Sequence, residues 1–140
     1  MASSAWWAFG SELQIGTTKV AEIIDINGPS MSRDAIETTK GDGTVGDGYR
    51  TFLPGFRDGG EISITGNWVP ADTTHDGSQG LLHVFEDLDT LQAFVIETSS
   101  SPVVAIGFSG ILTSFNVDLP LEEQGKLDCT IKISGAVTFT

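Results

Sequence analysis

A few short motifs contain the residue types used in nucleotide binding or hydrolysis. Gly41, Gly43 and Gly46 reproduce the G-x-G-x-x-G spacing of dinucleotide sites, in which a helix after a buried strand points its N-terminus at the pyrophosphate. No strand or helix pattern flanks these glycines, and Asp42 and Asp47 would repel a pyrophosphate. We therefore interpret the segment as a glycine loop and predict no nucleotide cofactor.

Hydrolytic chemistry would need an activated serine with a histidine nearby. The segment Gly107-Phe-Ser-Gly110 is similar to a nucleophile elbow, but its second glycine comes one residue early and Ile111 stands in the required place. His75 and His83, the two histidines of the chain, are not flanked by a nucleophile motif. These observations predict that the protein is not an enzyme.

The candidate metal ligands also lack a site pattern. Cys129 is the single cysteine and lies on the apolar side of a predicted strand, where thiols usually pack in the core. Asp42, Asp47, Asp72 and Asp76 could gather a calcium ion, but their spacing does not reproduce a calcium-binding loop. We predict no metal site.

Composition indicates one folded domain with an acidic surface. A chain of 140 residues with 39% hydrophobic residues can bury one core, so residues 1–140 are expected to form a single domain. The formal net charge of −12 repels phosphate and argues against conventional DNA binding and against anionic membranes. The lone cysteine and the absence of a signal-like leader predict synthesis in a reducing cytoplasm.

Alternation of apolar and polar residues predicts a mainly β protein. Period two is clearest at 127–139 and 61–68, and Ile64, Trp68, Ile131 and Val137 are expected in the core. Further strands are expected at 20–26, 35–39, 91–98 and 103–117, the last bent near Gly107 and Gly110. Short turns favour antiparallel pairing in a sandwich or barrel.

One helix is expected between the strands. Leu81, Leu82, Phe85 and Leu88 have the spacing of one apolar face, which predicts that Phe85 is buried. Asp76 and Gln79 precede this face and are spaced as a helix cap.

Two segments are not assigned to a regular element. Residues 1–16 form a predicted N-terminal arm that contains Trp6, Trp7 and Phe9. Residues 40–60 form a predicted long glycine-rich loop with Tyr49, Phe52, Leu53 and Phe56 between its glycines. Both sets of apolar side chains are expected to contact a partner surface.

Several stretches together resemble a known family. Residues 28–39 (GPSMSRDAIETT), 49–60 (YRTFLPGFRDGG), 61–72 (EISITGNWVPAD) and 108–120 (FSGILTSFNVDLP) occur in the order found in major tail tube proteins of long non-contractile-tailed bacteriophages. The likeness extends from about Gly16 to the C-terminus. The N-terminal aromatic segment does not match the family pattern.

This resemblance implies a structural subunit of the virion tail, assembled in the bacterial cytoplasm. The implied assembly is a tube of stacked hexameric rings in which the sheets of all subunits join into one inner barrel, with the 40–60 loop reaching the next ring. Its implied partners are a tape measure protein, a tail terminator and baseplate or tail-tip proteins, and DNA passes through without specific binding. The alternative is a discrete β-sandwich binding module, such as a tail accessory or a carbohydrate- or surface-binding domain.

An acidic lumen would let DNA pass without retaining it, because attraction to phosphates would make the pore adhesive. The candidate lumen residues are the acidic ones on the polar sides of predicted strands: Asp25, Glu37, Glu61, Asp118 and Asp128.

Overall fold

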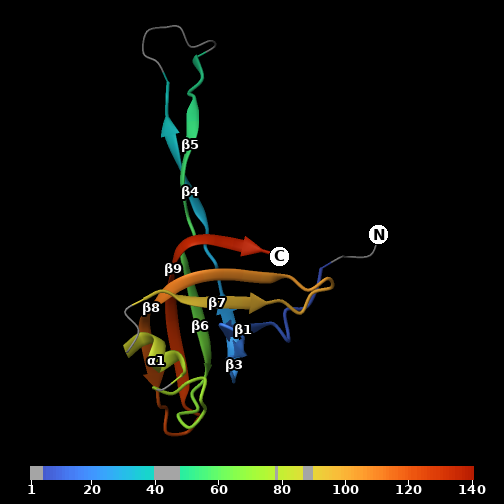
Figure 1. The fold of residues 1–140 in the computed structure, drawn as a ribbon, viewed down its shortest axis with the longest axis vertical. Helices are drawn as coiled ribbons and strands as arrows, with labels where there is room; N and C mark the ends of the chain where they lie inside the picture. Colours follow the sequence, from blue (N-terminus) through green and yellow to red (C-terminus); the bar gives the residue numbers. More distant parts are fainter. Residues whose placement is uncertain (1–4, 40–47, 78, 87–89) are drawn as a thin grey trace.

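The computed structural model describes residues 5–39, 48–77, 79–86 and 90–140. Its main element is an antiparallel sheet of seven strands in the order β2-β1-β7-β8-β9-β6-β3. The strands are β1 (Glu12–Ile15), β2 (Thr18–Lys19), β3 (Ile23–Asn27), β6 (Glu61–Asn67), β7 (Gln92–Glu97), β8 (Ala105–Asp118) and β9 (Lys126–Phe139). A separate hairpin of β4 (Ser32–Glu37) and β5 (Phe52–Asp58) projects from the body (Figure 1).

The seven-stranded sheet curls so that one apolar face is enclosed. The long strands β8 and β9 pair along most of their length. They lie between the β3-β6 pair and the β7-β1 pair and connect the two parts of the sheet. Register shifts interrupt this ladder at Gly107/Ser109 and at Leu112/Ser114, and such bulges bend strands. The enclosed core contains Leu13, Ile62, Ile64, Phe94, Phe108, Leu112, Leu127, Cys129 and Ile131 among others.

A short helix, α1 (Leu81–Glu86), packs against β8 and buries Leu81 and Val84. The loop before it is held by His75, whose side chain is 0% exposed. The backbone N–H of Val69 donates to His75 Nδ1 at 3.1 Å, and Nε2 lies 2.6 Å from the carbonyl oxygen of Ala21. One hydrogen bond of the His75 ring thus lies within the loop before the helix, and the other joins this loop to the segment before β3.

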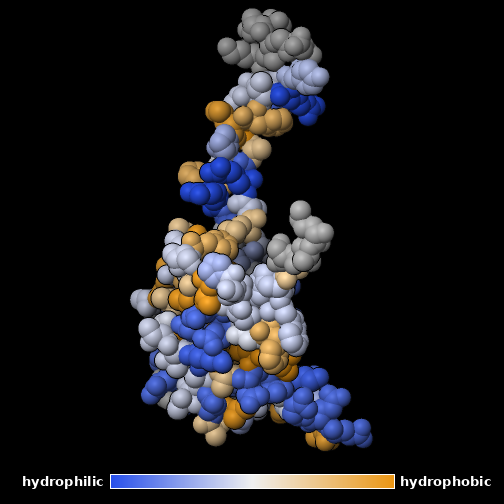
Figure 2. Space-filling model, turned by 90° about the vertical axis from the view of Figure 1, so that its right-hand side faces the viewer, coloured by the Kyte–Doolittle hydropathy of each residue, from blue (hydrophilic) through white to orange (hydrophobic). Residues whose placement is uncertain are grey.

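The β4-β5 hairpin leaves the body where β3 ends and β6 begins. Gly59 and Gly60 make this exit possible: a Cβ on Gly59 would lie 2.5 Å from Ile133, and Gly60 has a φ of +77°. Such positions favour glycine. Except for the half-buried Gly55, every residue of the two strands is exposed. Figure 2 shows hydrophobic and hydrophilic patches alternating along the projecting hairpin.

The mainly β antiparallel fold with one helix is confirmed, and each predicted strand has an observed counterpart. Three expectations need correction. Residues 52–58 of the predicted loop form β5, residues 12–15 of the predicted arm form β1, and Phe85 is 45% exposed. Residues 40–47 of that loop and Leu88 of the predicted helix lie outside the described residues.

The burial of the C-terminal strand gives a stability prediction. Ile131 is 0% exposed, so Ile131→Ala should lower the free energy of unfolding by about 2–5 kcal/mol through lost burial and a residual cavity. Phe85→Ala is the matched comparison on an exposed site and should cost clearly less. Urea denaturation measures both, and equal effects would contradict this assignment of the core.

Candidate functional site

A continuous polar face covers the side of the sheet opposite the core, across β3, β6, β9 and β8. Strand register aligns its side chains in rows. One row crosses the four strands as Asp25, Thr65, Asp128 and Asn116, and the next row as Asn27, Ser63, Thr130 and Ser114. The period of two that buries Ile62, Ile64, Cys129 and Ile131 therefore turns the polar alternates to one common surface.

Four of the five predicted lumen residues are exposed on this polar face: Asp25, Glu61, Asp118 and Asp128. The fifth, Glu37, lies on β4 of the hairpin, where Arg50 Nε is 3.9 Å from its Oε1. No ion pair involves the four face carboxylates within the described ranges.

The two lysines of the polar face are directed to carboxylates at its ends. Lys132 Nζ lies 3.5 Å from Asp58 Oδ1, and Lys126 Nζ lies 3.2 Å from Glu123 Oε2. A hydrogen bond from the Gly60 backbone N–H, together with the charge of Lys132, lowers the pKa of Asp58. The face as a whole has four carboxylates against two ammonium groups, so it is net negative.

Two strand edges that border the polar face have no neighbour within the described part of the chain. β3 pairs only with β6. β8 pairs with β7 only as far as Gly110, so Ile111 to Asp118 pair with β9 on one side alone. Unpaired edges of this kind expose backbone N–H and C=O groups that can add another strand. The sequence pattern did not reveal them, because an edge depends on which strands become neighbours.

The predicted contact residues of the hairpin are all exposed. Tyr49, Phe52, Leu53 and Phe56 are 76%, 52%, 57% and 91% exposed. The structure thus places these apolar groups in or beside a solvent-exposed ribbon and not in the core, where large apolar residues usually lie.

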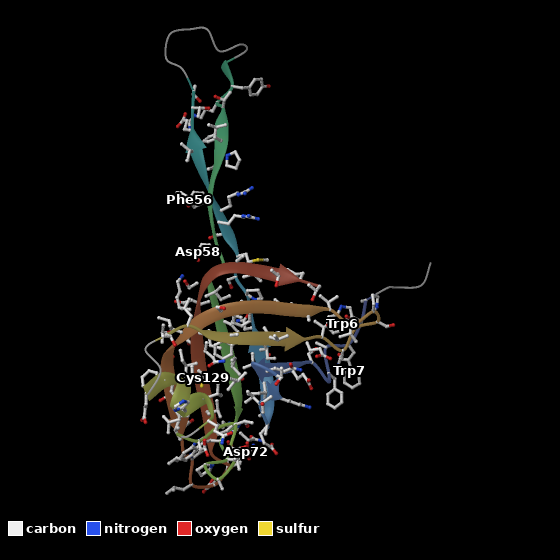
Figure 3. All side chains as sticks on the ribbon, viewed as in Figure 1. Trp6, Trp7, Phe56, Asp58, Asp72 and Cys129 are labelled. Atoms are coloured by element: carbon white, nitrogen blue, oxygen red, sulfur yellow. The ribbon has the colours of Figure 1, made fainter. Side chains whose placement is uncertain are left out.

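The predicted contact residues of the N-terminal arm are also exposed, at 51% for Trp6, 80% for Trp7 and 76% for Phe9. The rings of Trp7 and Phe9 stack with centroids 5.0 Å apart. Ser99 Oγ donates to the Trp7 carbonyl oxygen at 3.1 Å and attaches the arm to the body. A groove of about 710 Å³ separates the arm from β3, with Ile24 and Ile26 on its wall. Figure 3 shows Trp6 and Trp7 on the same side of the molecule.

The residues considered as a nucleophile, a base or metal ligands have structural positions in the fold. Ser109 lies in the β8 ladder opposite Ala93 and Ser134, and both ring nitrogens of His75 have backbone partners. No group of three or more His, Cys, Asp or Glu residues that could hold a metal occurs in the described part of the chain. Asp72 accepts hydrogen bonds from the side chain and backbone of Thr74, which lower its pKa. Asp42 and Asp47 lie outside the described residues.

Comparison of the chain with known protein families indicates a tail protein. Residues 8–140 match the family model described as Lambda phage tail tube protein, TTP. The chain belongs to this family. It is therefore a structural, non-enzymatic component of the virion tail. No curated protein sequence matches the chain, and none of the helices described is long and apolar enough to cross a membrane.

Solved tail structures share the fold of this tail tube family member. A chain in the tail of an empty gene transfer agent particle has a TM-score of 0.65 at 18% identity, with 87% of this chain and 84% of that chain covered. A chain in the sheath/tube terminator of an extracellular contractile injection system has a TM-score of 0.75 at 14% identity, covering 100% and 99%. A chain in the tube-terminating cap of the anti-feeding prophage has a TM-score of 0.73 at 16% identity, covering 100% and 93%.

Cys129 gives a test of how tightly this fold is closed. Burial, and secondarily the charge of Asp128, raises the pKa of the thiol to about 12. Because the thiolate is the reactive form, the native protein should react very slowly with a thiol reagent such as Ellman's reagent at pH 8, and at the rate of a free cysteine after unfolding in guanidinium. Rapid modification of the folded protein would contradict a closed core.

Proposed function

We propose that this tail tube protein assembles into stacked hexameric rings whose net negative lumen conducts DNA. The observation that supports the ring best is the position of the two free strand edges at opposite sides of the polar face. An edge at each side allows copies to join side by side, and repeated addition around an axis closes a barrel without leaving an edge exposed.

Strand direction also favours a joint between β8 of one subunit and β3 of the next. Successive strands in β3-β6-β9-β8 are antiparallel, and their number is even. Under rotation about a common axis, the free edge of β8 in one subunit therefore meets β3 of the next in antiparallel orientation. The polar faces then form one inner surface. The C6 symmetry of the gene transfer agent tail supports six subunits here.

The N-terminal arm would cover this joint from outside the barrel. The groove beside β3 lies between Trp7, Phe9 and the exposed Ile24. Phe115 and Val117 of β8 are half-buried and lie on its apolar face, so in a neighbouring subunit they would extend toward this groove. Trp6, Trp7 and Phe9 are thus proposed as contacts between subunits of one ring.

The hairpin would connect successive rings, because it projects beyond the body along the long axis of the molecule (Figure 1). Tyr49, Phe52, Leu53 and Phe56 are proposed as its contacts.

The further proposed partners are a tape measure protein, a tail terminator and baseplate or tail-tip proteins. The terminator and the cap among the structural neighbours support a tail terminator as a partner.

Cross-linking tests the ring joint. Asp25→Cys on β3 and Asn116→Cys on β8, combined in one chain, should give a ladder ending at six subunits with a short bis-maleimide, because buried Cys129 does not compete. The control combines Asn116→Cys with Thr18→Cys on β2, and should give no ladder.

Electron microscopy of the uncross-linked protein should show tubes. Persistent monomers at high concentration would contradict the proposed function and favour a discrete binding module.

Charge reversal tests the lumen. Asp128→Lys would place one lysine per subunit on the polar face, and each could pair with a DNA phosphate within the screening length of about 8 Å. DNA ejection from virions with such tails should slow at low salt. The control for total charge is Glu86→Lys, because Glu86 is exposed at the end of α1. Ejection as fast as in the wild type would refute an inward-facing position of the polar face or a role for its charge.

A further inference from the structure

A hollow of about 640 Å³ lies at the base of the β4-β5 hairpin. The hairpin and the residue before it contribute Met31, Arg33, Phe56, Arg57 and Asp58 to its wall, and the C-terminal half of β9 contributes Ile133, Gly135, Ala136 and Val137. Met31 is 54% exposed and Phe56 is 91% exposed. In Figure 3, Phe56 lies on the lower part of the projecting hairpin, and Asp58 lies nearer the body. The hollow is an open, mostly apolar surface that carries two cationic groups, Arg33 and Arg57, and one carboxylate, Asp58.

The two arginines face each other without a counterion among the described residues. Arg33 and Arg57 are directly opposite each other in the β4-β5 register, an arrangement that is destabilising for like charges. In the described part of the chain, neither guanidinium has an ion pair. Asp58, which follows Arg57 and also lines the hollow, accepts a hydrogen bond from the Gly60 backbone N–H and pairs with Lys132. The hollow is therefore complementary to an apolar segment that carries carboxylates.

The turn between β8 and β9 has this chemistry. Leu121 is fully exposed and Leu119 is 60% exposed, and they are followed by exposed Glu122 and Glu123. The Glu123 backbone N–H donates to the Pro120 carbonyl oxygen at 3.2 Å, which holds the segment as a compact turn. Glu123 forms a solvent-exposed ion pair with Lys126. Glu122 has no ion pair within the described residues.

The turn and the hollow lie toward opposite ends of the molecule. Figure 1 shows the connection from β8 to β9 at the lower end of the long axis and the hairpin at the upper end. One chain cannot bring the two together. A contact between such different surfaces is heterologous, and it propagates along an axis instead of closing on itself.

We infer that the 119–123 turn of one copy docks into the hairpin-base hollow of a copy in the adjacent ring. The inference rests on the proposed stacking of rings and assigns its partner surfaces. Leu121 contacts the apolar wall formed by Phe56 and Val137, and Glu122 and Glu123 pair with Arg33 and Arg57. The leucine supplies buried apolar area, and the charges fix register and suppress wrong pairings.

Two sets of exposed substitutions test the docking. Arg33→Glu with Arg57→Glu, and separately Leu121→Ser, should leave rings intact but raise the protein concentration needed for tube formation by about tenfold or more. The matched control is Leu91→Ser, a leucine 52% exposed outside the hairpin and the turn. Electron microscopy and sedimentation measure stacking, and circular dichroism with thermal unfolding verifies the fold.

A charge swap makes the test specific. Combining Arg33→Glu and Arg57→Glu with Glu122→Arg and Glu123→Arg should restore tubes that neither pair of substitutions forms alone. Tubes that form equally well in all variants would overturn the docking while leaving the proposed function intact, as would a swap that restores nothing. If Leu121→Ser leaves stacking unchanged, the 119–123 turn does not occupy the hollow and the inference fails. A wild-type protein that forms no tubes overturns both proposals.

Discussion

The β8-β9 ladder is the constraint on which the rest of the structure depends. It is the one pairing that belongs to both halves of the curled sheet, since β9 continues to β6 and β3 while β8 continues to β7 and β1. Its register shifts bend the pair, so that apolar residues from both halves meet in one core. β7 begins at Gln92, opposite Gly110, so the edge of β8 at 111–118 has no second neighbour within the described residues. The strand that helps to close the core thus also presents an unpaired edge.

The sequence predicted the core strands well where alternation was strict. Ile64 and Ile131 are confirmed as fully buried, while Trp68 and Val137 are half-buried at the border of the core. The prediction for Phe85 was wrong because several apolar residues of so short a helix have helical spacing. Packing against β8 selected Leu81 and Val84, and the periodicity alone could not make that choice.

The β5 strand was missed for a different physical reason. Pro54, Gly55, Gly59 and Gly60 are typical of loops, and a proline would remove a ladder hydrogen bond in a central strand. In a two-stranded ribbon each strand is an edge, so a proline can be accommodated there. The polar face was largely predictable, because its carboxylates alternate with core residues. Glu37 lies on the hairpin instead of on this face, a difference that alternation does not reveal because it does not tell whether a strand belongs to the sheet or to the hairpin.

The β4-β5 ribbon has mechanical consequences for a tail. It is two strands wide and its side chains are almost all exposed, so no second layer resists its bending. Stretching it along the strands would instead strain covalent backbone and break several cross-strand hydrogen bonds together. In a stack whose rings are connected by such ribbons, tension is carried along the chain while adjacent rings can still tilt. A tube of this kind would keep its length under load and yet follow a curved path.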